Sequence, residues 1–558
     1  MNAARLLALY ERIAEAPDAV ARLRRFVLDL AVRGKLVSQD AGDEPASELL
    51  KRIAREKARL VKLGEVRKPR ELGSADEIEA PFPVPPSWKW IRLDGVGAII
   101  GGGTPSAADA ENFAEPGDGV PWLTPADLGG HTELYVSRGA RDLSEKGART
   151  SSATIMPAGT VLFTSRAPIG YVAIASNPLA TNQGFKSIVP YVVECSRFIA
   201  VAMKAFAPEI DAKAPGTTFK EVSGKIVAAV PFPLAPLAEQ HRIVAKVDEL
   251  MALCDRLEAA RTAREAARDR LAAASLARLN TPDPETFPTD ARFALDALPA
   301  LTTRPDQIKD LRQTILNLAV RGKLVPQDAR DEPVSALIAR IGTYRQHHQA
   351  GRAQTQSIRP IPEAEAPHPV PSGWAWFRFG DITVCRDGRR VPVSKEERSG
   401  RAKLYDYYGA SGVIDRIDGY LFDQPLLLIG EDGANLINRS TPIAFMARGR
   451  YWVNNHAHVI DGVSEDFLRY LELFINATDL KLYVTGTAQP KMNQAKMNSI
   501  PVALPPQGEQ ERILARVNEL MGLCGILEAG LTDATTTRTR LLEVTLTDTL
   551  APLPEIAA

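Results

Sequence analysis

The chain has 558 residues, 45% of them hydrophobic, which is enough for several globular domains with apolar cores. Its 68 basic residues are balanced by 68 acidic residues. Zero net charge argues mildly against a protein that binds nucleic acid strongly on its own, but it is compatible with a subunit that binds DNA as part of a more basic complex. No apolar run is long enough to cross a bilayer, no signal-peptide pattern is present and the four cysteines form no CxxC pair, so we expect a cytoplasmic protein without a structural metal.

The first predicted element is a helical block that occurs twice. Residues 23–53 and 311–341 are identical at 21 of 31 aligned positions, at a fixed offset of 288. Apolar residues in this block follow a helical spacing of three and four, and Gly34 and Gly322 stand where each helix is expected to end. We assign the first copy to an N-terminal helical region over 1–80, and we interpret the duplication as one structural unit present twice.

A divergent segment follows each copy of this block, the first over 81–236 and the second over 366–506. Both open with a proline-rich stretch and a Trp-x-Trp pattern, beginning at Trp88 and Trp374, which predicts a first β-strand. Short strand-like runs and turn residues alternate inside both segments, and both close with a Gly-Thr pair and another proline-rich strand. These features predict two unlike globules of mixed α/β structure.

Another duplicated block follows each globule, over 239–254 and 509–524. Its offset is 270 instead of 288, so one intervening segment is 18 residues shorter than its counterpart. No proline or glycine interrupts residues 239–279, which predicts a helix on the order of 60 Å long at 1.5 Å per residue. The apolar positions repeat in heptads and predict a helix-pairing seam. The seam residues are Ile243, Val247, Leu250, Cys254, Leu257, Ile513, Val517, Leu520, Cys524 and Leu527.

The helices outside the globules are expected to pair with one another. In the central region, 237–365, a proline-rich loop over 281–288 lets a long helix and a returning helix fold back antiparallel. By the same repeat logic, the C-terminal helix in 507–558 is expected to pair with the N-terminal region. The predicted fold class is therefore α/β in the α+β sense: two mixed globules separated by long antiparallel paired helices, with a pseudo-twofold internal repeat.

Catalytic motifs are absent from the sequence. No amino-methyltransferase motif of the Asn-Pro-Pro-Tyr kind and no Walker loop is present, so we predict no catalytic residue and no cofactor bound by this chain. His456 and His458 alternate in a predicted strand and are expected to face the same way. Hydrogen bonding to structure or to a base is favoured over metal binding there by roughly four to one, because a third spaced ligand is missing.

Polar side chains suited to base edges stand in glycine-rich loops of both globules. Asn and Gln can form two hydrogen bonds to adenine and Arg can do so to guanine, while Tyr packs against a sugar or base. Taken singly, each residue is better explained as part of a solvated loop; as a set they favour recognition over catalysis. The DNA-binding candidates are Gly103, Thr104, Ser165, Arg166, Asn182, Gln183, Lys186, Thr217 and Lys220 in the first globule, and Arg389, Arg390, Tyr408, Ser411, Glu431, Asn435, Asn454, Asn455, His456, Gln489, Lys491 and Asn493 in the second.

The repeats and motifs resemble those of one family. The duplicated Leu-Ala-Val-Arg-Gly-Lys-Leu-Val run, the Glu-Gln-x-Arg-Ile helix after a proline-rich strand, the run from Gly430 to Asn435 and the run from Trp452 to Val459 resemble the specificity subunit of type I restriction-modification systems. The resemblance implies two target-recognition domains, each of which reads half of a split, asymmetric double-stranded DNA sequence. It implies helices that fix the unread gap and dock two methyltransferase subunits, with two restriction subunits as further partners. S-adenosylmethionine, ATP and magnesium are then expected in the partner subunits.

Two other functions remain open at this point. A coiled-coil scaffold whose globules bind protein instead of DNA would show the same helical pattern. The specificity component of another phage-defence system would share the same recognition domains. A self-contained methyltransferase-endonuclease ranks below both, because its catalytic motifs are missing.

Overall fold

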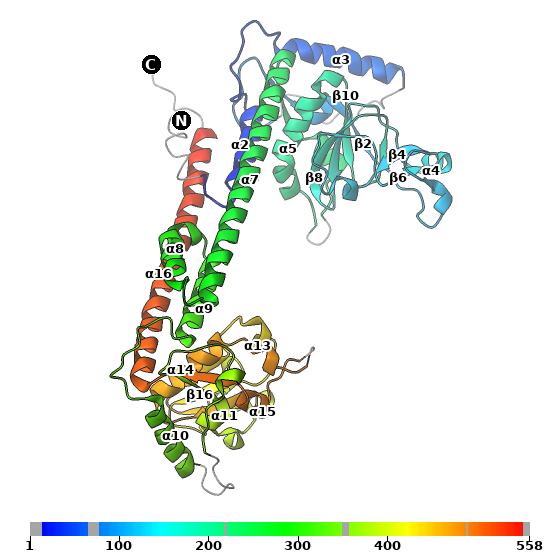
Figure 1. Ribbon diagram of the computed structural model, residues 1–558. Helices are drawn as coiled ribbons and strands as arrows, with labels where there is room; N and C mark the ends of the chain where they lie inside the picture. The colour runs from blue at the N-terminus through cyan, green and yellow to red at the C-terminus, as the bar shows by residue number, and fades with distance from the viewer. Residues whose placement is uncertain (1–13, 65–77, 217–219, 349–356, 487–488, 551–558) are drawn as a thin grey trace. The chain divides into compact units, whose positions relative to one another are not determined.

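The computed structural model describes residues 14–64, 78–216, 220–348, 357–486 and 489–550. The chain divides into two compact units (Figure 1). Unit 1 comprises residues 1–263 and 535–558, and unit 2 comprises residues 264–534. Two long helices, α7 (Leu237–Asn280) and α16 (Gln507–Leu550), each contribute one part to each unit. None of the described helices is long and apolar enough to span a membrane.

Unit 1 contains the first globule, which is joined to its helices by a short neck. In the neck, β1 (Lys89–Arg92) pairs antiparallel with β11 (Pro231–Leu234), and β11 leads directly into α7. Before the neck come α2 (Ala19–Val32) and α3 (Ala46–Lys62). The helix α2 ends at Val32 with Arg33 as its C-cap, and Gly34 follows with a φ of +64°, as expected for a glycine just after a helix C-terminus.

The globule of unit 1 is built on a five-stranded sheet in the order β2-β10-β7-β8-β5. Its central strand β7 is buried on both faces, because Val161 and Phe163 point into the main core while Leu162 points into a second cluster. The helix α5 packs on β7 and β8, and α2 packs on α5 (Figure 1). The strands and helices of the globule are β2 (Gly97–Gly101), β3 (Phe113–Ala114), β4 (Val120–Leu123), β5 (Tyr135–Val136), β6 (Arg141–Leu143), α4 (Glu145–Thr150), β7 (Val161–Ser165), β8 (Ile169–Ala175), β9 (Ala180–Thr181), β10 (Lys186–Pro190), α5 (Ser196–Ala212) and α6 (Gly224–Ala228). The strands β3, β6, β4 and β9 form a separate four-stranded sheet.

Unit 2 has the same kind of neck but a different globule. Its neck pairs β12 (Ala375–Arg378) with β20 (Pro501–Leu504), and β20 leads into α16. One sheet has the strand order β13-β19-β16-β17 and another the order β15-β14-β18, while α14 packs on β16 and β17. The elements are α11 (Phe379–Ile382), β13 (Val384–Cys385), α12 (Lys395–Ser399), β14 (Tyr405–Gly409), β15 (Gly412–Ile417), β16 (Leu426–Gly430), α13 (Asn435–Asn438), β17 (Ala444–Ala447), β18 (Tyr451–Val453), β19 (Ala457–Asp461), α14 (Glu465–Ala477) and α15 (Gln494–Asn498). The predicted α/β class with two unlike mixed globules is confirmed.

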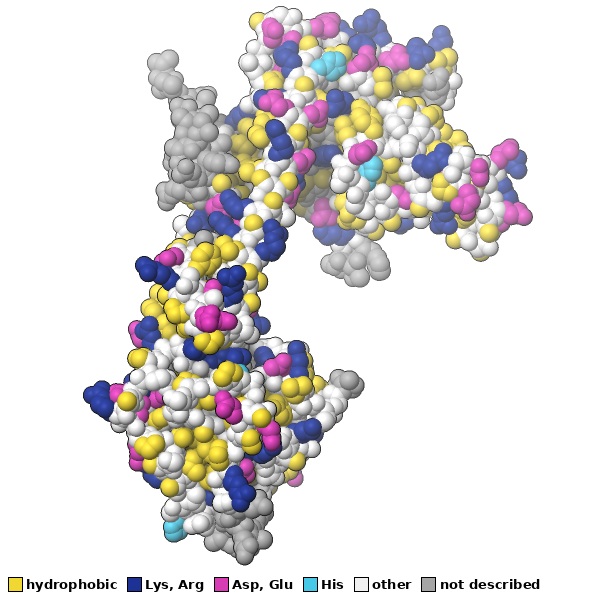
Figure 2. All heavy atoms as spheres, in the orientation of Figure 1, with side chains coloured by type: hydrophobic (Ala, Val, Ile, Leu, Met, Phe, Trp, Pro, Cys, Tyr) yellow, Lys and Arg dark blue, Asp and Glu magenta, His cyan; other side chains and the backbone are white. Residues whose placement is uncertain are grey.

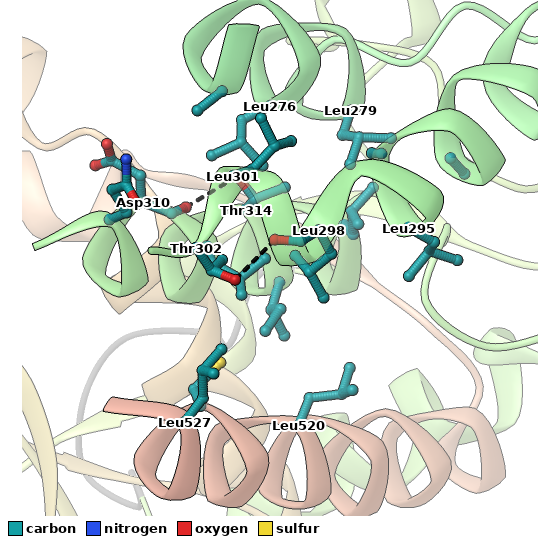
Figure 3. Close-up of a pocket in the computed structure, with 18 of the residues that line it drawn as sticks. Leu276, Leu279, Leu295, Leu298, Leu301, Thr302, Asp310, Thr314, Leu520 and Leu527 are labelled. Atoms are coloured by element: carbon teal, nitrogen blue, oxygen red, sulfur yellow. Dashed lines mark hydrogen bonds between the residues drawn. The ribbon is translucent and has the colours of Figure 1, made fainter. Parts of the chain in front are cut away.

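The helical part of unit 2 contains α8 (Phe287–Leu301), α9 (Gln307–Val320) and α10 (Val334–His348). The sequence predicted a loop over 281–288, whereas α8 begins inside this stretch, because a proline is tolerated in the first turn of a helix. Leucines of α7, α8 and α16 line an apolar cavity of about 630 Å³ beside α9 (Figure 3).

Matching ion pairs hold the duplicated helices in both units. In unit 1, Arg24 of α2 lies 2.8 Å from Glu258 of α7; in unit 2, Arg312 of α9 lies 2.8 Å from Glu528 of α16. The offsets of the two repeats, 288 and 270, relate these residues one to one. In unit 1, α2 also contacts the end of α16, where Phe26 packs with Leu542 and Leu546. In unit 2, α9 and α7 are joined by Asn317 and Asn280 at 2.9 Å.

The predicted seam lies within the core of each unit. Ile243 and Val247 of α7 belong to the same buried cluster as residues of α2 and of the neck, and Ile513 and Val517 of α16 have equivalent positions in unit 2. Cys254 and Cys524 are buried at matching positions, while Leu250, Leu257, Leu520 and Leu527 are half-buried. The heptad spacing thus marks the apolar face of each long helix, and the duplicated block and the neck cover much of that face.

Candidate nucleic-acid interface

The loops that carry the candidates of unit 2 are held together by backbone hydrogen bonds. The loop after β16 is central, because the Glu431 amide donates to the His456 carbonyl at 2.9 Å and the Glu431 carbonyl accepts from the Met492 amide at 2.8 Å. The Asn454 amide donates to the Tyr408 carbonyl at 3.1 Å. Segments far apart in the sequence therefore meet at one end of the two sheets. We name the loops around residues 386–390, 431–435, 454–456 and 489–493 the unit 2 loop cluster.

A network of charged side chains lies beneath this cluster. Arg390 donates to Glu431 at 2.8 Å and lies 3.2 Å from Asp387, and Lys491 lies 3.1 Å from Glu431. His458, only 1% exposed, directs Nδ1 at Asp387 at 2.6 Å and Nε2 at the Met492 carbonyl at 2.8 Å. Both ring nitrogens of His458 thus face acceptor atoms, a carboxylate on one side and a carbonyl on the other.

The network changes the acidity of its two carboxyl groups. Burial alone would raise the pKa of Asp387, but the hydrogen bond and the charge of His458 outweigh burial and hold this pKa below its usual range. Burial likewise opposes ionisation of Glu431, and the hydrogen bond from Arg390 with the charge of His458 lowers its pKa nonetheless. Both side chains are therefore stabilised as anions beneath the loops.

The same three side chains also raise the question of a metal site. One ligand atom from each of Asp387, Glu431 and His458 lies within 4.8 Å of the others. However, Arg390 and Lys491 already contact the carboxylates, and both nitrogens of His458 face acceptors. A cation could bind there only if Arg390, Lys491 and the His458 ring moved away from their present partners, so these side chains suit an internal ion network better than a metal site.

Burial divides the unit 2 candidates into exposed tips and supporting groups. The exposed candidates are Arg389, Ser411, Asn455, His456, Gln489, Lys491 and Asn493. The supporting candidates are Arg390 within the ion network, Tyr408 against Phe445 and Tyr451, Glu431, Asn435, which binds the Thr441 backbone, and Asn454, which accepts from the His456 amide. The prediction that His456 and His458 alternate in one strand is wrong for His456, which stands in the turn before β19 with its side chain 51% exposed, beside Asp432, whereas His458 lies in β19 and is buried.

The unit 1 candidates gather around the ends of β7 and β10. Lys186 lies 3.5 Å from Glu221, and Arg166 lies 3.6 Å from the same carboxylate. Exposed Thr104 donates to exposed Gln183. The accessible polar surface that the sequence candidates offer in unit 1 thus consists of Thr104, Arg166, Gln183 and Lys220, with Lys186 largely covered beside them.

Other unit 1 candidates have structural partners. Ser165 is fully buried, and its backbone binds Gly184 and Val222. Gly103 is buried with its carbonyl accepting from the Trp122 indole, and an added Cβ would lie 2.4 Å from the Ala153 nitrogen. These two residues support the loops instead of offering a side chain to a base.

Of the remaining three unit 1 candidates, two have hydrogen-bond or ion-pair partners in the structure. The Asn182 side chain accepts from the Gly184 amide at 2.8 Å, and Lys220 pairs with Asp211 at 3.2 Å. Thr217 lies outside the described residues.

Sequence reasoning missed the acidic partners of the basic candidates. Asp387 stands close to the candidates Arg389 and Arg390 in the sequence, but its role depends on His458, which is 71 residues away. Glu221 pairs with Lys186 and Arg166, and no local pattern marks it. Lys and Arg side chains alternate with Asp and Glu on the face shown in Figure 2, in keeping with the zero net charge.

Comparisons with known proteins agree with this arrangement. A family model described as the type I restriction modification DNA specificity domain matches residues 85–264 and 371–534, each match beginning just before a neck and ending in a long helix. The chain is 30% identical over 567 residues to the type I restriction enzyme EcoAI specificity subunit of Escherichia coli, covering 95% of this chain and 93% of that protein. It is 28% identical over 566 residues to the EcoEI specificity subunit of Escherichia coli, with the same two coverages.

Among solved structures, the HsdS subunit from Thermoanaerobacter tengcongensis aligns over 85% of this chain and 98% of its own, at 16% identity and a TM-score of 0.42. The family model covers more than half of the chain, and the EcoAI relative covers nearly all of it. The chain therefore belongs to the family of type I restriction-modification specificity subunits, with two target-recognition domains that serve DNA recognition.

Proposed function

We propose that the chain reads a split, asymmetric DNA sequence, with one half-site read by each recognition domain and an unread gap set by the long helices. The observation that supports this proposal is a contrast within each unit: the globules differ from each other, whereas the helices to which they are attached are alike. The two globules differ in strand order, while the helices that hold them share the Arg24–Glu258 and Arg312–Glu528 pairs at equal distances. Two different recognition domains mounted on similar helices suit a DNA target whose two half-sites differ in sequence.

The exposed side chains of the unit 2 loop cluster supply the chemistry for reading bases. Asn455 and Gln489 can each pair with adenine through two hydrogen bonds, and Arg389 can do so with guanine, whereas the Asn493 side-chain oxygen already accepts from the Lys496 amide at 2.9 Å. The ion network beneath them offsets the charge of Arg390 and Lys491. The loops therefore offer directional hydrogen bonding and little net charge, which favours sequence-dependent contacts over general attraction to phosphate.

The duplicated helices are the proposed supports for partners. Because like surfaces bind like partners, the two copies would dock two methyltransferase subunits, and two restriction subunits would complete the complex. In this proposal the chain itself catalyses no reaction. S-adenosylmethionine, ATP and magnesium belong to the partner subunits, and the complex acts on DNA in the cytoplasm.

Mapping of modified adenines in cells with and without this chain tests the proposal. We expect modification at one split sequence, with an adenine in each half, and loss of that modification when the chain is removed. Modification that persists without the chain, or that follows a single continuous sequence, would refute the proposal.

A protein-binding scaffold is the second candidate, since helical pairing alone is compatible with it. A mobility-shift experiment with the assembled complex separates the two functions. The DNA-reading function predicts a shift with a duplex that carries both half-sites and a much weaker shift with either half alone. Equal binding to unrelated duplexes, or none to any duplex, would favour the scaffold.

A further inference from the structure

A buried carboxylate stands at the start of the long helix in unit 1. Glu239 of α7 is 1% exposed. Its Oε2 accepts from the Trp88 indole at 2.9 Å, and its Oε1 accepts from the Gln39 amide at 2.6 Å. Trp88 stands immediately before β1, and Gln39 lies in the loop between α2 and α3, so one carboxylate ties three segments together. We call Gln39, Trp88 and Glu239 the unit 1 joint.

The joint reaches into the recognition domain. Trp88 packs edge-on against Phe198 of α5, with ring centroids 5.9 Å apart, and Phe198 packs in turn on Phe232 of β11. One turn further along α7, Arg242 forms two hydrogen bonds to Asp43, at 3.0 and 2.6 Å. The start of α7 is thereby fixed both to the interior of the domain and to the loop after α2.

Unit 2 repeats this joint with the same distances. Glu509 of α16 is also 1% exposed, and it accepts from the Trp374 indole at 2.9 Å and from the Gln327 amide at 2.6 Å. Arg512 forms two hydrogen bonds to Asp331, at 2.9 and 2.6 Å. The recognition domains differ in length and in sheet order, so equal joints do not follow from equal globules.

The neck alone leaves the orientation of a recognition domain weakly determined. It consists of β1 and β11, paired over four residues, and a two-stranded ribbon twists easily. Glu239 adds hydrogen bonds to Trp88, which directly precedes this ribbon, and to Gln39 in a separate segment, and together these bonds oppose rotation about the ribbon. Gly34 packs beneath them, where an added Cβ would lie 2.6 Å from Pro85.

We propose that Glu239 and Glu509 are positioning residues that hold each recognition domain in one orientation on its long helix and thereby restrict the length of the unread gap in the DNA target. This inference rests on the proposed reading of a split sequence. A carboxylate suits the task because it offers two acceptor oxygens in a fixed plane, each of which binds a donor from a different segment. A glutamine of equal size keeps one acceptor and turns an NH₂ group towards the other donor.

The test uses the assembled complex with its methyltransferase subunits and a set of duplexes. Each duplex carries both half-sites of the mapped target, and the gap has its natural length or is one or two base pairs shorter or longer. The variants are Glu239→Gln, Glu509→Gln and both together. Glu465→Gln is the matched control, because Glu465 stands at the start of α14, outside the duplicated helices, with its side chain 42% exposed and paired with Arg448.

We expect each joint variant to keep the base preferences of both half-sites. The ratio of methylation at the natural gap to methylation at a gap one base pair longer or shorter should fall about tenfold, which corresponds to about 1.4 kcal/mol of lost discrimination. The double variant should lose more, and the control should match the unaltered complex. An unchanged gap ratio in both single variants overturns the proposal, and so does a change in base preference at either half-site.

A second variant keeps the test decisive if Glu239→Gln fails to fold, and a second measurement does so if the proposed function itself fails. If Glu239→Gln does not fold, Gln39→Ala removes one donor and leaves the Trp88 bond in place; it should relax the gap to a smaller degree, and an unchanged ratio overturns the proposal. If the unaltered complex modifies no split sequence, it is the proposed function that fails. In that case hydrogen exchange at residues 88–92 reports on the joint directly, and native protection in Glu239→Gln overturns the inference.

Discussion

Replacement of Glu431 by glutamine tests whether the buried ion network organises the unit 2 reading surface. The change keeps the size of the side chain and removes its charge. Glu431 has a side chain 11% exposed and contacts Arg390 at 2.8 Å and Lys491 at 3.1 Å. Loss of one partner from a buried ion pair costs about 3–5 kcal/mol. Because Arg390 keeps Asp387 and the Lys491 side chain is 54% exposed, we expect the lower end of that range, about 3 kcal/mol.

The assay has a stability part and a binding part. Thermal unfolding should show a loss of several degrees in the transition of unit 2, since about 1 kcal/mol shifts the midpoint of a domain of this size by about 2–4 °C. Binding to duplexes that change one half-site at a time should show weaker discrimination at the half read by unit 2 and unchanged discrimination at the other half. Glu465→Gln is the control, because Glu465 forms an exposed pair with Arg448 in the same unit, worth about 1 kcal/mol or less. Equal loss of discrimination at both half-sites, or a stability loss no larger than that of the control, would refute the reasoning.

Three further predictions follow from the same structure. Asn455→Ala removes an exposed amide from the unit 2 loop cluster and should cost about 1–3 kcal/mol of base discrimination at one half-site only; equal weakening on unrelated duplexes would show that Asn455 touches the DNA backbone instead. Deletion of about four residues within 259–279 of α7 removes about one helical turn, about 5.4 Å, and methylation mapping should find a gap changed by one or two base pairs with both half-site sequences kept; altered half-sites with the old gap would contradict this. The third prediction concerns acid unfolding. The pKa values of Asp387 and Glu431 are lowered in the folded state, so their contribution to stability is present above the unfolded pKa values, about pH 4, and is lost as the pH falls through the lower folded values. Burial raises the pKa of Glu239, so its contribution has the opposite sign: it is present at low pH and is lost as the pH rises through the folded pKa. Glu431→Gln should therefore flatten the acid limb of the unfolding curve, and an unchanged acid limb would speak against the ion network.

Much of the architecture follows from the sequence alone. The duplicated blocks, with offsets of 288 and 270, determined that the chain has two like helical supports and two unlike globules, because repeated sequence folds into repeated structure. Heptad spacing located the apolar face of each long helix, since helical geometry turns spacing directly into direction. The family was identified from the duplicated order of these blocks together with their motifs, and the comparisons confirm it.

Only the tertiary structure decided which polar side chains face solvent and what covers each apolar face. Ser165 ends β7 and Asn454 is next to the exposed Asn455, yet both Ser165 and Asn454 are buried, and their backbones bind segments distant in the sequence. His458 meets Asp387 across 71 residues, and Glu239 meets Trp88 across 151. Such contacts depend on how strands and helices pack in three dimensions. The spacing of residues in the sequence predicts which face of its own helix or strand a side chain occupies, but it does not predict which distant residue packs against that face.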